Sequence, residues 1–389
     1  MTHALIIGGG IAGTTTAMAL NKAGISSTVY EAYPSGGNDI GAFLQIMHNG
    51  MDALRAIDAD QVVVDGSFRT SQVEYLDAAG KPFVSRSIGG EHARDDGVRT
   101  LSRASLYHAL QNELVRRGGR IEHNKRLSNA ASVAGGRVLA YFTDGTQAEG
   151  DLLIGADGIH STIRTVVDAQ APVPRYSSMN IVYGRTADPA IPMGQDVFRM
   201  IHGNRGLFGY TTSPEGVTFW VTYLPGSALS KTEIASITPM QWRERLSALF
   251  TDDADTTAAR IVGATDNFSA SGVYDIPSLP TWYRGSMVLV GDAAHAADPQ
   301  AAQGASMALE DSVILAQCLR DLPTLSEAFY MYERIRRPRV ERLVAFSGAH
   351  TSSLDQAKDK ASPEKRAWLY EHHIEWNSLI TADNTTVTL

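Results

Sequence analysis

The sequence has 389 residues and a single cysteine, Cys318. One cysteine excludes an intramolecular disulfide and fits a reducing compartment, and its place in a helical pattern predicts a buried structural thiol. Long apolar runs are also missing, because none reaches the roughly 20 residues of a membrane-spanning helix. The chain passes from Met1-Thr2-His3 straight into a strand pattern without a charged leader. We therefore expect a soluble, cytoplasmic protein without a membrane partner.

The chain also has no excess of basic over acidic residues. The chain has 34 Lys and Arg against 42 Asp and Glu, which gives a formal net charge of −8. Nucleic-acid binding depends on a basic face that neutralises phosphates, so we expect no nucleic-acid partner. The length predicts two domains, or one domain with a large insertion. No metal site is predicted.

A glycine-rich loop near the N-terminus, Gly8-Gly9-Gly10-Ile11-Ala12-Gly13, follows a short buried-strand pattern. A helix and a second strand come next, and Glu31 ends that strand. This order of strand, G-x-G-x-x-G loop, helix, strand and acid is typical of dinucleotide-binding folds. Gly8 permits the tight turn, Gly10 lets the backbone approach a pyrophosphate, and Gly13 lets the helix lie close to the strand. Glu31 can accept hydrogen bonds from a ribose.

Two further segments combine a buried strand, a tight turn and the start of a helix. In the middle of the chain, a strand precedes Gly155-Ala156-Asp157-Gly158, whose aspartate taken alone suits a helix cap. Later, a strand precedes Gly291-Asp292-Ala293-Ala294-His295 and a run of small residues, and a helix begins near Gly304. Small side chains leave room for a ligand, to which a helix start offers free N–H groups and a positive dipole end. Taken alone, the same stretch is a tightly packed crossover.

Arg103 stands at the start of a predicted helix over residues 104–117. A cation is unfavourable there, because the N-terminal end of a helix dipole is positive. The side chain therefore either points to solvent or is compensated by an anion.

Residues 173–269 differ from the rest of the chain in their pattern of apolar and polar residues. Apolar and polar positions alternate in four segments separated by Gly, Pro and Ser, which predicts an antiparallel sheet. Aromatic residues are frequent there and suit either a core or a ligand pocket, and a one-residue slip in register would exchange the two faces. From this sheet we predict that the substrate pocket is lined by Tyr183, Arg185, Phe198, Phe208, Tyr210 and Trp220.

The three glycine motifs together resemble those of the single-component (group A) FAD-dependent aromatic monooxygenases. This is the class of para-hydroxybenzoate hydroxylase and the tetracycline-modifying hydroxylases. The similarity extends over residues 2 to about 345 and includes Tyr332–Arg339, a helical segment typical of that family. It implies an α/β fold, in which a Rossmann-like FAD-binding domain of the glutathione-reductase type carries an inserted antiparallel-sheet substrate domain and C-terminal helices.

The resemblance also implies a division of the chain. We expect the FAD-binding domain to be discontinuous and to comprise residues 1–72, 99–172 and 270–345. The substrate-binding domain would comprise residues 73–98 and 173–269. A C-terminal helical segment would follow over residues 346–389.

Site residues are implied by position in the family motifs. The ADP half of FAD would be held by Gly8, Gly10, Ile11, Ala12, Gly13 and Glu31. Arg103 would lie near the pyrophosphate and the ribityl chain, Asp292 would bind ribityl hydroxyls, and Asp157 would serve both FAD and the nicotinamide cofactor. Pro299 would border the flavin ring and the substrate. The N1–C2 edge of the ring would face the helix start at Gly304, Ala305 and Ser306.

In that family NADPH or NADH reduces the flavin, O2 adds to form a C4a-hydroperoxide, and its distal oxygen passes to an electron-rich substrate. We therefore expect FAD as cofactor, an aromatic or polycyclic small molecule as substrate, and a monomer or homodimer. The nicotinamide cofactor would bind transiently, because a second G-x-G-x-x-G loop is missing. No catalytic side chain is predicted, since the flavin supplies the chemistry.

Two departures from the family pattern stand out. Ala302-Gln303-Gly304-Ala305-Ser306 occupies the place where Gly-Gln-Gly and then Asn are common, and the segment Ala32–Leu44 lacks the arginine that relatives often carry. Flavin mobility and the preference between NADH and NADPH therefore stay open. So do two alternative functions: a flavin-dependent oxidase or dehydrogenase on the same fold, and a non-catalytic FAD-binding accessory protein.

Overall fold

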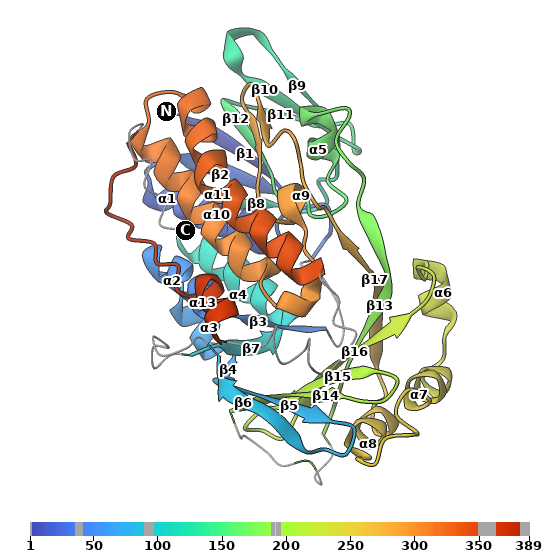
Figure 1. Cartoon of the computed structure of the whole chain (residues 1–389). Coiled ribbons are helices and arrows are strands. Elements are labelled where there is room, and N and C mark those ends of the chain that lie inside the picture. Colours follow the sequence, from blue (N-terminus) through green and yellow to red (C-terminus); the bar gives the residue numbers. More distant parts are fainter. Residues whose placement is uncertain are drawn as a thin grey trace.

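The computed structural model describes residues 2–35, 42–88, 97–187, 191, 196–348 and 363–381. Within these ranges, the helices are all too short or too polar to cross a membrane. The structure consists of a mostly parallel sheet covered by long helices and a larger antiparallel sheet beside it, as Figure 1 shows. The predicted α/β fold is confirmed.

The first sheet has six strands in the order β18-β19-β12-β1-β2-β8. Strands β19, β12, β1, β2 and β8 are parallel, and only β18 pairs antiparallel. Buried apolar runs explain the parallel strands, which are covered on both faces. Their bounds are β1 His3–Ile7, β2 Ser26–Tyr30, β8 Arg120–Glu122, β12 Leu152–Gly155, β18 Tyr283–Arg284 and β19 Met287–Leu289.

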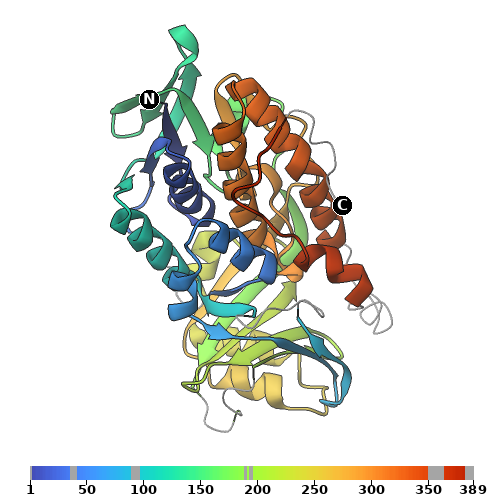
Figure 2. The same cartoon turned by 90° about the vertical axis from the view of Figure 1, so that its left-hand side faces the viewer.

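Helices α1, Ile11–Lys22, α10, Gly304–Asp321, and α11, Leu325–Gly348, pack side by side against this sheet (Figures 1 and 2). Helix α10 lies at the centre, because it contacts α1, α2 and α11. Every residue from Ser306 to Cys318 is buried, as the predicted helix from about Gly304 requires. Cys318 is a buried free thiol, which confirms that prediction.

The second sheet has seven strands in the order β17-β13-β16-β15-β14-β5-β6. All neighbouring strands are antiparallel except β14 and β5, which are parallel. The four strands predicted from alternation correspond to β13, β14, β15 and β16. The bounds are β5 Gln72–Asp77, β6 Pro82–Ser87, β13 Arg175–Thr186, β14 Val197–His202, β15 Leu207–Thr212, β16 Thr218–Pro225 and β17 Phe268–Asp275.

One face of this sheet is covered by short helices, and a separate apolar core lies between them and the strands. The other face turns toward the first sheet and the elements that link the two, so any site between the sheets lies on that face. Figure 1 shows the covering helices at the lower right, and their bounds are α6 Lys231–Ser236, α7 Pro239–Ser247 and α8 Thr257–Gly263.

Between the two sheets lies a small antiparallel sheet in the order β3-β7-β4. Another three-stranded sheet, β11-β10-β9, stands at the far end of the molecule (Figure 1). The remaining bounds are β3 Phe43–Ile46, α2 His48–Ala56, α3 Gln61–Asp65, β4 Phe68–Arg69, β7 Arg99–Ser102, α4 Arg103–Arg116, β9 Leu127–Ser132, η2 Ala134–Gly136, β10 Val138–Phe142, β11 Gln147–Gly150, α5 Thr162–Val167, α9 Asp292–His295, η3 Pro299–Ala301 and α13 Pro363–Tyr370.

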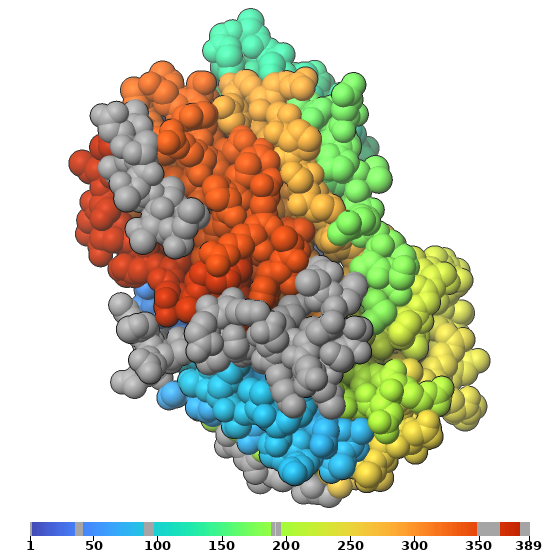
Figure 3. Space-filling model, in the orientation of Figure 1, coloured from blue at the N-terminus to red at the C-terminus, as the bar shows by residue number. Residues whose placement is uncertain are grey.

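The C-terminal segment, for which we predicted helical structure, is helical only in part within the described residues. Its described part contains α13, and residues 371–381 have no helical structure. Ile374 N donates to Asp52 Oδ2 at 2.8 Å, and the backbone carbonyls of Glu375 and Trp376 accept from Gln317 Nε2. These bonds to other helices replace the intrahelical ones. Figure 3 shows the C-terminal segment, in red, beside the orange helices.

Candidate functional site

The glycine-rich loop joins β1 to α1, and its glycines are required by close contacts. Gly8 has a φ of +107°, and a Cβ there would lie 2.4 Å from the Ala156 carbonyl oxygen. A Cβ on Gly13 would lie 1.9 Å from the Gly8 carbonyl oxygen. At Gly10, by contrast, a Cβ would meet no atom within 4 Å, since this residue opens on a cavity. The loop therefore holds α1 close to β1 and exposes the start of the helix.

The cavity has a volume of about 400 Å³ and runs from this loop to the seven-stranded sheet. At the loop end it is lined by Gly10, Ile11, Ala12, Arg103, Gly158 and Asp292. At the sheet end the lining changes to apolar and aromatic side chains. Pro299, Gly304 and Ala305 line the wall between the two ends. The structure thus brings together residues predicted to bind the cofactor and three of those predicted to contact the substrate, Tyr183, Phe198 and Pro299.

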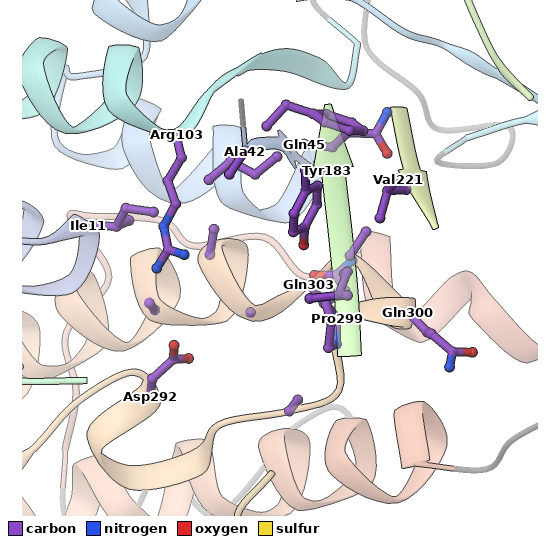
Figure 4. A pocket seen from close by; sticks show the side chains of 18 of the residues that line it. Ile11, Ala42, Gln45, Arg103, Tyr183, Val221, Asp292, Pro299, Gln300 and Gln303 are labelled. Carbon is purple, nitrogen blue, oxygen red and sulfur yellow. The ribbon is translucent and has the colours of Figure 1, made fainter. Parts of the chain in front are cut away.

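Arg103 and Asp292 point into the loop end from opposite walls, as Figure 4 shows. Arg103 is the first residue of α4, and its Nε donates to the Tyr107 hydroxyl at 2.9 Å. Asp292 is exposed to the cavity at the first turn of α9, and within the described ranges its carboxylate accepts no hydrogen bond. The cation at a helix start therefore faces a cavity that also holds an anion, and does not simply point to bulk solvent.

Gln303 lies beside the start of α10 and is 1% exposed. Its Oε1 accepts from Asn49 Nδ2 at 3.0 Å, whereas its buried Nε2 has no hydrogen-bond partner among the described residues. Because a buried donor without a partner costs about 1–3 kcal/mol, a ligand acceptor is expected there. An acceptor at Asp292 and a donor at Gln303, both in one cavity (Figure 4), fit the ribityl hydroxyls and the carbonyl-bearing ring of FAD.

Glu31 and Asp157 lie outside the cavity lining among the described residues, although both were predicted to bind cofactor. Glu31 accepts hydrogen bonds from Gly9 N at 2.6 Å and from Tyr33 N at 2.9 Å, so its carboxylate stabilises the glycine-rich loop. Asp157 accepts from Thr162 N at 2.7 Å, which makes it a cap of α5. Burial raises the pKa of Asp157, although its hydrogen bonds oppose the shift. The structure therefore favours the capping interpretation of Asp157.

Ser306 also lies away from the cavity. It is fully buried, and its Oγ accepts from Met47 N at 3.1 Å. A Cβ on Gly50 would lie 2.6 Å from the same Oγ. Ser306 thus joins α10 to the start of α2, and the prediction that it faces the flavin is corrected. Gly304 and Ala305 line the cavity.

The sheet end of the cavity is set by strand register. Tyr183 on β13 pairs with Val221 on β16, and both side chains line the cavity together with Phe198. Because successive side chains alternate between faces, residues at the other parity point away. Tyr223, two residues beyond Val221, lines the cavity too, and burial raises the pKa of its hydroxyl well above the ordinary value. That hydroxyl therefore stays protonated at neutral pH and can donate a hydrogen bond.

Four predicted substrate residues lie elsewhere, and we correct that prediction. Phe208 and Trp220 stack at 5.4 Å in the core under α7 and α8, and Trp220 Nε1 donates to Thr265. Tyr210 pairs with Trp220 across the strands and belongs to the same face. Arg185 is exposed. Phe208, Tyr210 and Trp220 have the wrong parity for the cavity, because the face was assigned without knowledge of the register. Arg185 shares the parity of Tyr183 but lies beyond the cavity lining.

Cavity residues that were not predicted from the sequence include Phe43, Gln45, Tyr75, Met200, His202, Leu207, Tyr223 and Arg366. Met200 and His202 follow Phe198 at spacings of two, so the alternation of β14 contained this information. Arg366 lies more than 140 residues from β14 in sequence and is brought there by α13. No local pattern indicates that contact.

A buried ion network supports the wall formed by α9 and α10. Arg336 on α11 pairs with Glu310 and, at 2.7 Å, with Asp311, and all three side chains are fully buried. Asp311 Oδ2 accepts from Gly291 N at 2.9 Å and contacts His295 Nε2 at 2.5 Å. His295 also stacks on Trp282, so it is a packing residue. Gly291 precedes Asp292, and the network therefore fixes where the Asp292 carboxylate stands.

The fold is that of the FAD-dependent aromatic monooxygenases. The chain belongs to the FAD binding domain family, whose model matches residues 1–347. It is 30% identical over 345 residues to the "probable 2-heptyl-3-hydroxy-4(1H)-quinolone synthase" of Rhodococcus erythropolis, covering 87% of this chain and 85% of that one. It is 28% identical over 400 residues to the 3-amino-4-hydroxybenzoate 2-monooxygenase of Streptomyces cremeus, covering 94% of each.

A solved structure with the same fold is that of Klebsiella pneumoniae HpxO complexed with FAD and uric acid. The TM-score is 0.81 at 24% identity, over 96% of this chain and 93% of the other. At this identity the likeness shows the fold alone. The predicted family is confirmed by the family match, and the chain is an enzyme of the FAD-dependent monooxygenase type.

Proposed function

We propose that this enzyme uses NADPH or NADH and O2 to hydroxylate an aromatic or polycyclic small molecule on bound FAD. One observation carries the proposal: a single cavity joins the glycine-rich loop to an aromatic face of the second sheet. Bound FAD would accept a hydride from the nicotinamide cofactor and activate O2 for transfer of one oxygen atom. The named activities of the relatives, such as 3-amino-4-hydroxybenzoate 2-monooxygenase, support the same reaction class.

The residues of the loop end would bind and orient FAD. The start of α1, with the open space at Gly10, suits the pyrophosphate, because backbone N–H groups and the helix dipole favour an anion there. Arg103 would add a positive charge to the same region, and Asp292 would accept hydrogen bonds from ribityl hydroxyls. The start of α10, at Gly304 and Ala305, would stabilise negative charge on the ring edge, and Gln303 Nε2 would donate to an acceptor there.

The residues of the sheet end would bind the substrate ring and exclude water. Tyr183, Phe198 and Phe43 lie close together, with ring centroids of Phe43 at 6.0 Å from Tyr183 and 6.3 Å from Phe198. A flat aromatic substrate fits between such rings and Pro299, which borders both ends of the cavity. Dry walls also protect a reactive oxygen species from water, which a hydroxylase requires.

The decisive experiment uses the FAD-loaded full chain, NADH or NADPH, and ¹⁸O2. The substrate panel is taken from the relatives: 3-amino-4-hydroxybenzoate, urate and 6-hydroxynicotinate. A product with one ¹⁸O atom from O2 supports the proposal. Turnover without label supports the oxidase or dehydrogenase alternative, and bound flavin that neither nicotinamide cofactor reduces supports the accessory protein.

Asp292→Asn tests the role of the acid in holding FAD. Replacing a charged acceptor by an amide is expected to weaken FAD binding by about tenfold, measured by flavin fluorescence quenching. Asp144→Asn is the matched control, because Asp144 pairs with Lys125 on a surface turn. Equal FAD affinity in Asp292→Asn and the control would remove Asp292 from the cofactor site.

A further inference from the structure

The sheet end of the cavity contains a charged group supplied by the C-terminal segment. Arg366 belongs to α13, and its side chain lines the cavity together with Tyr75 of β5 and His202 of β14. Figures 1 and 2 show α13 between the long helices and the seven-stranded sheet, at the level of β3 and β7. Three elements distant in sequence thus bring polar side chains to the same end of the cavity.

Arg366 is held in place by bonds to its own helix and to α11. Arg339 on α11 donates to the carbonyl oxygens of Trp368 at 2.5 Å and Leu369 at 3.0 Å, which fixes the last turn of α13. The Arg366 guanidinium lies 5.4 Å from the centre of the Phe346 ring, and its Nη1 donates to the Tyr370 hydroxyl at 3.5 Å. Burial opposes the charge, but Tyr75 and Tyr370 raise the pKa of Arg366, so it stays a cation.

His202 offers a neutral polar group that lines the same cavity. Its ring lies 5.9 Å from Tyr75 and 5.6 Å from Phe83. Burial lowers the pKa of His202, so the imidazole is neutral at physiological pH. Its Nε2 is buried and has no hydrogen-bond partner among the described residues. A buried polar atom that faces a cavity is satisfied when a ligand supplies its partner.

The charges of the lining residues are separated along the cavity. Arg103 and Asp292 lie at the loop end. Among the described residues that line the sheet end, Arg366 carries the charge. Tyr75, Tyr370 and the Phe346 ring lie near its guanidinium, and burial limits its contact with water, so water screens its field less than at an exposed site. Guanidinium groups in such surroundings favour a carboxylate or another oxyanion, which they bind in a fork geometry.

We propose that the substrate is an acidic aromatic molecule whose anionic group, such as a carboxylate, is bound by Arg366 with His202 as a second contact. This inference rests on the proposed function, because it places the substrate ring between Pro299 and the aromatic face of the sheet. It makes Arg366 a specificity-determining residue and gives the C-terminal segment a part in the substrate site. Neutral aromatics of equal shape are then poor ligands.

The test compares carboxylates with carboxamides of the same ring at neutral pH. Three pairs span the ring sizes: 4-hydroxybenzoate, 6-hydroxynicotinate and 4-hydroxyquinoline-2-carboxylate, each with its amide. Dissociation constants are measured by calorimetry on apo and FAD-loaded full chain. The wild-type protein should prefer the carboxylate of at least one pair by roughly tenfold or more, as expected for a charge-assisted hydrogen bond. In Arg366→Gln that preference should fall to about threefold or less.

Arg342→Gln is the matched control, because exposed Arg342 also packs on α13, with its guanidinium 4.2 Å from the Trp368 ring centre. It should keep the preference of the wild-type protein, and Arg366→Lys, which retains the charge and the fold, should keep part of it. The proposal is overturned if no pair favours the carboxylate, or if Arg366→Gln leaves the preference unchanged. It is also overturned if Arg366→Gln raises only the KM for NADH or NADPH. Failure to bind FAD would instead refute the proposed function, since the ligand pairs are also measured on apo protein.

Discussion

Replacing Arg336 by methionine tests the ion network that fixes the flavin-facing wall. Arg336 is fully buried between Glu310 and Asp311, which are fully buried too. Methionine is apolar and nearly as long as arginine, so the substitution removes the charge without leaving a large cavity. Two carboxylates then lose a shared cation in surroundings of low dielectric constant.

Removing one partner from a buried ion pair typically costs about 3–5 kcal/mol, because the other charge stays buried without compensation. Here some compensation remains. Arg339 still donates to both oxygens of Glu310 at 2.8 Å, and His295 still contacts Asp311 at 2.5 Å. We therefore expect the free energy of unfolding to fall by about 3 kcal/mol, the lower end of that range.

The loss should depend on pH in a defined direction. Burial alone would raise the pKa of Glu310 and Asp311, but Arg339 and Arg336 lower the first, and His295 and Arg336 lower the second. Depressed folded-state pKa values stabilise the wild-type protein above the ordinary carboxyl pKa of about 4, and this contribution is lost as pH falls toward the folded values. Without Arg336 the carboxyl groups protonate at higher pH. The difference between wild type and variant should therefore be larger near pH 8 than near pH 5.

The assay is urea unfolding of apo protein, followed by tryptophan fluorescence at both pH values. Arg334→Met is the control on the same helix, because Arg334 is exposed and its hydrogen bond to the Tyr330 hydroxyl is 3.5 Å long; a change within about 0.5 kcal/mol is expected. A loss below about 1 kcal/mol in Arg336→Met, or a loss that grows on acidification, would refute the reasoning.

Two further predictions contrast neighbouring positions. Gly13→Ala places a Cβ 1.9 Å from the Gly8 carbonyl and should lower the melting temperature and abolish FAD binding, whereas Gly10→Ala should fold normally and only weaken FAD binding; equal melting temperatures would contradict the packing argument. Phe208→Ala should cost about 3–5 kcal/mol of stability and leave ligand affinity unchanged, while Phe198→Ala should cost less and weaken the binding of aromatic ligands. Denaturant unfolding and calorimetry measure both, and the reverse pattern would show that the two faces of the sheet were assigned wrongly.

The parts of the site that were predictable from sequence depend on local chain geometry. At Gly8 and Gly13 the close contacts occur within the strand–loop–helix unit itself, so the spacing of the glycines was sufficient. The same holds for Asp292, which follows a buried strand and begins a helix. The division of the chain into domains stays a prediction.

The sheet face was not predictable, because parity depends on the register set by the turns. Tyr183 and Phe198 line the cavity, while Phe208 and Trp220 belong to the opposite face. Both sets alternate with polar residues, so composition does not separate them. Arg366 could not be found at all, since its place depends on how α13 packs on α11.

The departure at Ser306 has a structural reason that links α10 to the substrate side. Its hydroxyl accepts from Met47 N, and Gly50 leaves the space that the hydroxyl occupies. Met47 directly follows β3, whose Phe43 and Gln45 line the cavity. Asn49, in the same turn, donates to both Gln303 and Glu310 and so ties the cavity wall to the buried ion network. A shift of α10 would therefore move β3 as well as the flavin-facing helix start. Ser306 is therefore better explained as a residue that links α10 to the segment after β3 than as a flavin contact.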